Sequence, residues 1–145
     1  MPGPRSLLTN RDNVVILISI DGLANEYLTN PEFLHPNLDR IISKGVFAEL
    51  TPVFPTKTFP NHWAIITGLY PESHGIVENR FYDDVSGATF DYTKPDSLRS
   101  VWWGGEPFWV TAVKHGMKAA CYFWPGSEVE IQGTRPTYYL KYNQN

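Results

Sequence analysis

Residues 14–20 form a continuous apolar run, Val-Val-Ile-Leu-Ile-Ser-Ile, which limits the fold more than any other segment. A strand of this composition is typical of a parallel sheet covered on both faces, because a strand with one wet face would alternate apolar and polar residues. Parallel strands also need crossover connections, which helices usually supply. The run therefore predicts an interior strand of an α/β domain.

The segments after this run alternate between helical and extended patterns. Residues 36–44 carry apolar side chains at helical spacing, which predicts a short amphipathic helix that ends at Gly45. Residues 46–53 return to an extended pattern. A strand, a helix and a strand in this order are typical of a right-handed crossover.

The second half of the chain predicts further elements of both kinds. They are, in chain order, a helix at residues 61–68, a hairpin near residues 83–90, a helix at residues 107–115 and a buried strand at residues 118–124. The first of these helices is entered through Thr58 and Pro60. The whole pattern predicts an α/β fold with a mainly parallel sheet and helices on both faces. Ligands of such folds bind beyond the carboxyl ends of the strands.

Length and composition suit one packed domain. The chain has 145 residues, 42% hydrophobic and 14% aromatic, and a net charge of -3 without a basic patch. We therefore expect no nucleic-acid polymer as a partner, while a single nucleotide remains open. No apolar run reaches the roughly 18 residues of a membrane helix, and Cys121 alone forms no intrachain disulfide framework. Residues 1–13 are expected to be a flexible segment and not a secretory signal. Residues 14–145 are expected to belong to a single domain.

Asp21 and Thr58 are the first candidates for chemistry. Asp21 directly follows the apolar run in an Asp-Gly turn, so it is either a turn-capping residue or a metal ligand. Thr58 stands where a loop enters a helix, and the unpaired backbone N–H groups and the helix dipole attract an anion at such a position. It is either the N-cap of the helix or a nucleophile activated by a divalent metal.

The histidines give no metal-binding pattern by themselves, because none forms a His-x-His or His-x-x-x-His pair with another. His62 lies within the expected helix and His74 in a Pro-Glu-Ser-His-Gly turn. Each is either structural, through ring hydrogen bonds to the backbone, or a ligand. His115 stands in the last turn of its expected helix, where a cation is favourable.

Longer motifs resemble the nucleotide pyrophosphatase/phosphodiesterase family of the alkaline phosphatase superfamily. They are Ile20-Asp-Gly22, Phe54-Pro-Thr-Lys-Thr-Phe-Pro-Asn-His62, Thr67-Gly-Leu-Tyr-Pro-Glu-Ser-His-Gly-Ile76 with Asn79, Trp102-Trp-Gly-Gly-Glu-Pro107 and Phe123-Trp-Pro-Gly-Ser-Glu128. The resemblance covers roughly residues 14–142. It implies an alkaline-phosphatase-like fold, with residues 14–145 as the N-terminal portion of a phosphodiesterase catalytic domain.

The resemblance also implies zinc-dependent hydrolysis of nucleotide phosphodiester or pyrophosphate bonds through a covalent threonine intermediate. Asp21 would bind one of two zinc ions, and Thr58 would bind the same ion and attack phosphorus. Asn79 and the Thr58 backbone N–H would hold a phosphoryl oxygen, although by position alone Asn79 suits a turn. Phe59 and Tyr142 would stack on the two faces of a nucleobase, although Phe59 alone suits a core.

The remaining zinc ligands of that family lie downstream of Asn145, and the chain offers no Asp-x-x-x-His or Asp-His pair in their place. We therefore expect a truncated chain, in which residues 138–145 close no helix or strand, and which is inactive alone. The open edge and apolar face of a truncated sheet are expected to favour aggregation.

Two alternatives stay open. A lipid or choline phosphodiesterase of the same family would share Asp21, Thr58 and Asn79 and differ in the pocket, and an inactive fragment would have a binding role. A sulfatase-like relative is disfavoured, because its nucleophile is a modified Cys or Ser while Cys121 lies in an expected strand. The chain does not define a localisation, but the resemblance implies a secreted enzyme or one anchored at the membrane and facing outward.

Overall fold

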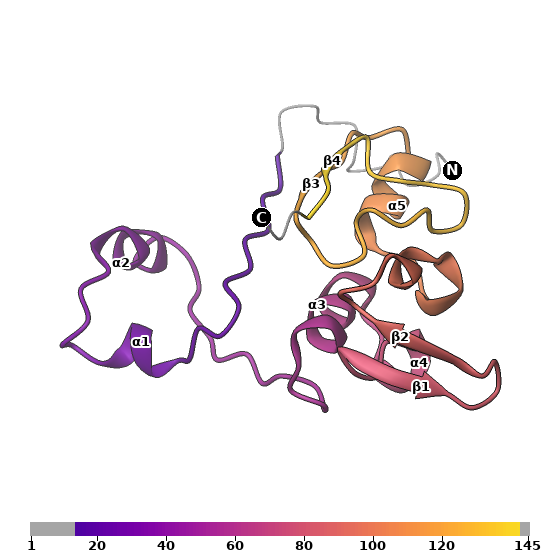
Figure 1. Ribbon diagram of the computed structural model, residues 1–145. Helices are drawn as coiled ribbons and strands as arrows, with labels where there is room; N and C mark the ends of the chain where they lie inside the picture. The colour runs from indigo at the N-terminus through magenta and orange to yellow at the C-terminus, as the bar shows by residue number, and fades with distance from the viewer. Residues whose placement is uncertain (1–13, 143–145) are drawn as a thin grey trace, which may run out of the picture. The chain divides into compact units, whose positions relative to one another are not determined.

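The computed structural model describes residues 14–142 of the chain (Figure 1). The chain divides into two compact units, Met1–Glu49 and Leu50–Asn145, and each is described by itself. The flexible segment expected at residues 1–13 lies outside the described residues. The boundary after Glu49 falls within residues 14–145, for which the resemblance implied the N-terminal portion of a catalytic domain.

The first unit contains two short helices, α1 (Glu26–Thr29) and α2 (Pro36–Ile42). α2 confirms the predicted helix, begins with a proline and ends where the Ser43 N–H donates to the Asp39 carbonyl at 2.8 Å. His35 Nδ1, just before α2, lies 2.8 Å from Asp39 Oδ1. Neither helix has a buried residue. Local hydrogen bonds are therefore the main contacts that hold these helices.

Residues 14–20 do not form the predicted strand. Within the described residues 14–49 no strand is present, and the apolar side chains of the run are exposed, Val15 over 91% and Ile18 over 77% of its surface. The apolar pattern shows only that a segment suits burial between two layers. A strand also needs hydrogen-bonded neighbours at its edges. The predicted crossover to residues 46–53 is absent from this unit for the same reason.

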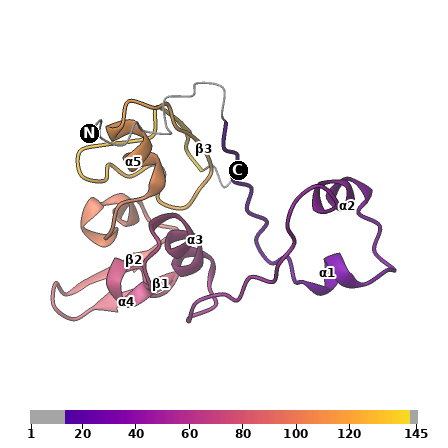
Figure 2. The ribbon, with the colours of Figure 1, turned by 180° about the vertical axis from the view of Figure 1, so that it is seen from behind.

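The second unit holds the other helices and all strands of the described chain (Figures 1 and 2). Its elements are α3 (Thr58–Thr67), α4 (Pro71–His74), β1 (Arg80–Asp83), β2 (Ala88–Asp91), the 3-10 helices η2 (Pro95–Leu98) and η3 (Ser100–Trp102), α5 (Phe108–Lys114), β3 (Ala120–Tyr122) and β4 (Tyr138–Leu140). The two predicted helices and the hairpin are confirmed as α3, α5 and β1–β2. The strand predicted at residues 118–124 is present as β3, but two of its three residues are exposed, so it is not the buried strand that was expected. Gly68, with a φ of 69°, ends α3 as predicted.

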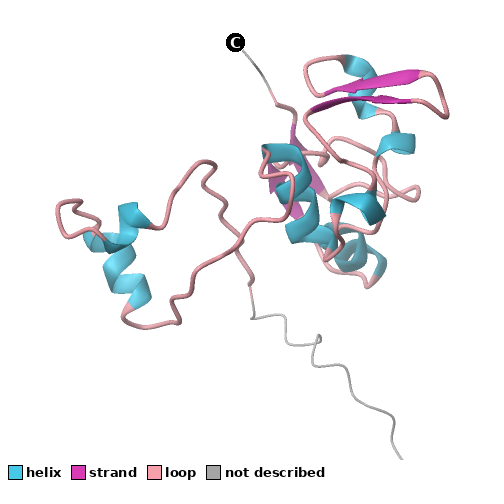
Figure 3. Cartoon of the chain, turned by 90° about the horizontal axis from the view of Figure 1, so that it is seen from below, coloured by secondary structure: helices cyan, strands magenta, loops and turns pink. Residues whose placement is uncertain are grey.

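The strands form two separate pairs (Figure 3). β1 and β2 are antiparallel, with Arg80 opposite Asp91, whereas β3 and β4 are parallel, with Cys121 opposite Tyr139. The α/β class is confirmed, but a mainly parallel sheet with helices on both faces is not, because one pair is a local hairpin and neither pair extends further in the described residues. β4 also corrects the expectation that residues 138–145 close no strand.

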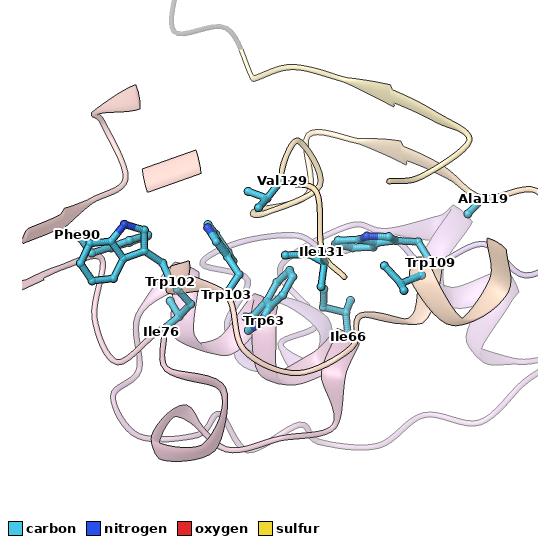
Figure 4. Close-up of a cluster of buried hydrophobic side chains, with 11 residues drawn as sticks. Trp63, Ile66, Ile76, Phe90, Trp102, Trp103, Trp109, Ala119, Val129 and Ile131 are labelled. Carbon is cyan, nitrogen blue, oxygen red and sulfur yellow. The ribbon is translucent and has the colours of Figure 1, made fainter. Parts of the chain in front are cut away.

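The core of the second unit is built around indole rings (Figure 4). Trp63 of α3 is fully buried between Trp103, at 4.8 Å between ring centroids, and Trp109 of α5, at 5.8 Å. Its Nε1–H donates to the Gly104 carbonyl at 2.8 Å. Because Trp63 is fixed in this close-packed core, the first turn of α3 has a defined place in the unit.

Gly126 shows how tightly these rings are packed. A Cβ atom at this position would lie 2.6 Å from Cζ3 of both Trp63 and Trp103, closer than side-chain atoms approach. Its φ of 82° is also in the left-handed region that favours glycine. The turn at Gly126 therefore closes the core on the side of the α3 indole.

Candidate functional site

Thr58 is the first residue of α3 and is half-buried. Lys57 occupies the N-cap position with an extended backbone, φ -117° and ψ 158°, and its carbonyl accepts the Asn61 N–H at 3.2 Å. The N-cap interpretation of Thr58 is therefore corrected by one position. Its hydroxyl belongs to the first turn of the helix, where N–H groups without helical partners favour an anion.

Asn79 reaches the same turn from the other side. Its Oδ1 accepts the backbone N–H of Phe59 at 3.0 Å. An oxygen must face that N–H, so the other end of the amide, Nδ2, is the end that can donate to a ligand. The structure therefore places the Asn79 amide beside Phe59, the residue that follows Thr58.

The main chain of Asn79 is held on both sides. Glu78 Oε1 accepts its N–H at 2.8 Å, and its carbonyl accepts the N–H of Tyr92 at 3.2 Å. The second bond continues the ladder of the β1–β2 hairpin, in which Arg80 pairs with Asp91. The hairpin therefore carries the Asn79 amide to the start of α3.

A polar cluster stabilises the base of this hairpin. Asp91 Oδ1 accepts hydrogen bonds from the hydroxyl of Thr93 at 2.7 Å and from its N–H at 3.0 Å, and Oδ2 lies 2.8 Å from Arg80 Nη2. The bonds from Thr93, supported by the nearby Arg80 charge, lower the pKa of Asp91. The carboxylate is therefore charged when the hairpin is formed.

His62 has a structural contact with the proposed nucleophile. Its Nδ1 lies 2.7 Å from the Thr58 carbonyl, one helical turn back, and its ring packs edge-on against Trp124 at 5.2 Å between centroids. Trp124 Nε1 in turn donates to the His62 carbonyl at 3.2 Å. These contacts favour the structural interpretation of His62.

His74 and His115 are also in backbone contacts. His74, the last residue of α4, is fully buried, and its Nδ1 accepts the Ile76 N–H at 3.1 Å. Burial lowers the pKa of His74, and the Pro60 carbonyl and the Glu72 charge offset this only in part. His115 Nδ1 lies 2.8 Å from a carbonyl in the last turn of α5, that of Thr111.

Phe59 lies at the edge of the core. Its ring contacts Phe90 at 6.2 Å, Trp103 at 6.1 Å and Tyr92 at 5.1 Å between centroids. Tyr142 contacts a different ring, that of Phe123, at 6.0 Å, and is 62% exposed. The aromatic ring in contact with Phe59 on this side is therefore that of Tyr92, a residue that the sequence did not single out. The ring of Tyr142 contacts Phe123 instead.

The predicted hairpin is the sequence feature from which the position of Tyr92 beside Asn79 could have been found. The hairpin was predicted, and the register that pairs Arg80 with Asp91 makes Asn79 and Tyr92 the next opposed positions. The register itself was not predicted, because it depends on the length of the turn between the strands. Tyr92 is 44% exposed, so its ring borders both the core and the surface beside Phe59.

Asp21 belongs to the first compact unit and is exposed there, in the turn that it forms with Gly22, whose φ is 71°. A carboxylate oxygen such as that of Asp21 is a ligand type that zinc accepts. Within residues 14–142, however, no group of three His, Cys, Asp or Glu side chains is placed to hold a metal ion. The described residues by themselves therefore do not fit a zinc site.

Residues 15–145 match the family described as type I phosphodiesterase/nucleotide pyrophosphatase, and the chain belongs to this family. It is 45% identical to ectonucleotide pyrophosphatase/phosphodiesterase family member 3 of Mus musculus and 47% identical to a venom phosphodiesterase of Macrovipera lebetinus. Each match covers 90% of this chain, but the chain spans only 15% and 16% of the two relatives.

Solved structures agree with this assignment. The structure of murine ectonucleotide pyrophosphatase/phosphodiesterase 5 matches 81% of this chain at 38% identity with a TM-score of 0.73, and the match covers 32% of that protein. An inactive threonine-to-alanine variant of the same murine protein, in complex with AMP, matches with a TM-score of 0.75 at 37% identity, with the same coverage. The chain therefore shares the fold of this family over the matched region. Among residues 14–142, no helix combines the length and apolar character needed to cross a membrane.

Proposed function

We propose that this chain contributes the nucleophile to an enzyme that hydrolyses nucleotide phosphodiester or pyrophosphate bonds. The observation that carries the proposal is the start of α3, where Thr58 is followed by an N–H bound to the Asn79 side chain. The family match supports the reaction class, and the AMP complex of the murine relative supports a nucleotide as substrate. That relative is inactive when a threonine is replaced by alanine, which supports a threonine as the nucleophile.

The proposed reaction has two displacements at phosphorus. Thr58 Oγ bonds to phosphorus, the bond from phosphorus to the leaving oxygen breaks, and the hydroxyl proton ends on the leaving group. A water molecule then bonds to phosphorus, the bond to Thr58 Oγ breaks, and Thr58 regains a proton from that water. The products are a nucleoside monophosphate and an alcohol or a phosphate.

Asn79 would act on the charge that develops in both steps. Its Oδ1 is bound to the Phe59 N–H, which leaves Nδ2 to donate to a phosphoryl oxygen. The backbone N–H of Thr58 would be the second donor. Donors that are already in place when charge develops are among the largest single contributions to catalysis.

Two zinc ions remain part of the proposal for the complete catalytic domain, with Asp21 and Thr58 as ligands of one ion. Bound zinc would lower the pKa of the Thr58 hydroxyl and offset charge on phosphorus. No step is assigned to a metal from the described residues, because they do not form a metal site alone. The names of the relatives, an ectoenzyme and a venom enzyme, support an outward-facing or secreted location.

The test is the hydrolysis of 4-nitrophenyl thymidine monophosphate by the complete protein that contains these residues. Thr58→Ala should lower kcat by about 10³-fold or more, because the covalent step is lost. Thr58→Ser keeps a hydroxyl and should retain measurable turnover. Full activity of Thr58→Ala would contradict the proposal. Faster turnover of a lysophosphatidylcholine than of ATP would instead favour a lipid-directed enzyme.

A further inference from the structure

The side chain of Asn61 binds the loop that leads into the proposed nucleophile. Asn61 lies in the first turn of α3, and its Oδ1 accepts the Val53 N–H at 2.8 Å. Its Nδ2 donates to the carbonyls of Pro55 at 2.9 Å and Lys57 at 3.0 Å, with a longer contact of 3.3 Å to the Val53 carbonyl. One amide thus contacts the loop at three of its residues.

Few backbone bonds hold this loop: the Pro55 carbonyl accepts the Lys57 N–H at 2.8 Å, and the Lys57 carbonyl accepts the Asn61 N–H at 3.2 Å. Residues 51–57 belong to no helix or strand, so their backbone polar groups need partners other than a ladder. The direction of the amide is settled by its partners, since Val53 offers a donor and the loop carbonyls are acceptors. A residue of α3 therefore ties the helix to the loop that precedes it.

We propose that Asn61 is a positioning residue of the reaction, which fixes the loop 53–57 and through it the Thr58 hydroxyl. This inference rests on the proposed function, and it assigns Asn61 no contact with the substrate. A nucleophile must be held close to its productive position, and a misplacement of about 1 Å can cost on the order of 10²-fold in rate.

Asn61 and Asn79 have complementary places around Thr58. Asn61 binds the chain before Thr58, up to the Lys57 carbonyl, and Asn79 binds the first N–H after it, that of Phe59. His62 adds a contact to the Thr58 carbonyl itself. The residue that would carry the covalent bond is thus restrained on both sides, and Asn61 provides the restraint on the side of the loop.

The test compares Asn61→Asp with a structural control in the complete protein. Asn61→Asp keeps the shape and the oxygen that faces Val53, but it places a second oxygen against the Pro55 and Lys57 carbonyls. We expect kcat for 4-nitrophenyl thymidine monophosphate to fall by about 10²-fold. We expect KM to change little, because the aromatic rings at Phe59 are not altered.

Thr67→Val is the matched control at the other end of α3. It removes the hydrogen bonds of the Thr67 hydroxyl to the Trp63 carbonyl, at 2.7 Å, and from the Leu69 N–H, at 3.3 Å. It should lower thermal stability and leave kcat within about twofold of wild type, because the loop bonds remain. A loss of kcat that follows stability alone, equal in Thr67→Val and Asn61→Asp, would overturn the positioning role.

Two further measurements keep the outcomes distinct. If Asn61→Asp does not fold, Asn61→Ala, which introduces no charge, is assayed in its place, and wild-type kcat in that variant would overturn the inference. The rate at which a threonine adduct forms in a single turnover should fall with kcat. If Thr58→Ala is itself active, the proposed function fails. If Thr58→Ala is inactive and the Asn61 variants are fully active, only the role of Asn61 fails.

Discussion

The Asn79 side-chain oxygen and the Phe59 backbone nitrogen lie 3.0 Å apart and form a hydrogen bond across 20 residues of sequence. This bond joins the end of the β1–β2 hairpin to the first turn of helix α3. It also fixes which end of the amide faces a ligand. The geometry of the proposed oxyanion donor is therefore built before any substrate binds.

Two substitutions of Asn79 separate its two roles. Asn79→Asp keeps an oxygen for the Phe59 N–H and removes the Nδ2 donor, so it should retain most of the thermal stability and lower kcat by about 10²- to 10³-fold. Asn79→Ala removes both groups and leaves that N–H without its partner, which should cost a further ~1–3 kcal/mol of stability. Urea unfolding and steady-state kinetics on the same samples measure the two effects. Equal stability of the two variants would show that the bond to Phe59 contributes nothing.

Tyr92 and Tyr142 compete as the second aromatic partner of a base beside Phe59. The ring of Tyr92 lies 5.1 Å from that of Phe59, whereas the resemblance assigned to Tyr142 the face of the base opposite Phe59. We expect Tyr92→Ala to raise KM for a nucleotide substrate by about tenfold, the loss expected from one base–aromatic contact. Tyr92→Phe, which keeps the ring, should leave KM near the wild-type value.

Tyr142→Ala decides between the two residues. If only this variant raises KM, the assignment from the resemblance is right and Tyr92 belongs to the core. If both variants do, the base meets both rings. The hydrogen bond between Tyr92 and Asn79 joins the Tyr92 backbone N–H to the Asn79 carbonyl. Tyr92→Ala changes only the side chain, so it leaves this bond in place.

Gly126 tests the packing behind α3. Gly126→Ala would place a methyl group against two indole rings and would also require an alanine at a φ of 82°. Gly116→Ala is the matched control, because its φ is 75° and no atom lies within 4 Å of the added Cβ. The control should cost about 1 kcal/mol of backbone strain, and Gly126→Ala about 2 kcal/mol more for the overpacking. The difference in free energy of unfolding between the variants measures the clash alone, and a zero difference would show that the rings yield.

The elements that were predicted correctly have causes within a few residues of sequence. Helix α3 was predicted from a proline in its first turn and a glycine at its end. Each of these residues acts on the backbone only within a few positions of itself. The strand predicted at residues 14–20 failed, because its apolar pattern says nothing about which strand would supply its hydrogen bonds. The resemblance singled out Asn79 as a donor to a phosphoryl oxygen, but its bond to the Phe59 N–H was not predicted, because it joins positions 20 residues apart in the sequence. The contact of Tyr92 with Phe59 depends on a hairpin register and was not found at all.

His74 should make the second unit sensitive to acid. Its Nδ1 accepts the Ile76 N–H, so a proton on Nδ1 would break that bond within a fully buried site. Burial accordingly makes the pKa of His74 in the folded chain lower than its ordinary value of 6.5. As the pH falls below about 6.5, the unfolded chain binds the proton first, so the free energy of unfolding decreases until the lower folded-state pKa is reached. Above about pH 6.5 this contribution to stability is complete.

The measurement is urea unfolding of the chain at about pH 7.5 and about pH 5, for wild type and His74→Asn. Asparagine often accepts an N–H two residues ahead, as His74 does here, and it does not titrate in this range. The smaller side chain should lower stability at both pH values, since part of a buried ring is lost. Wild type should therefore lose more stability than His74→Asn between the two pH values, and other acidic groups cancel in that comparison. An equal loss in both proteins would show that His74 is protonated as readily in the folded chain as in the unfolded one.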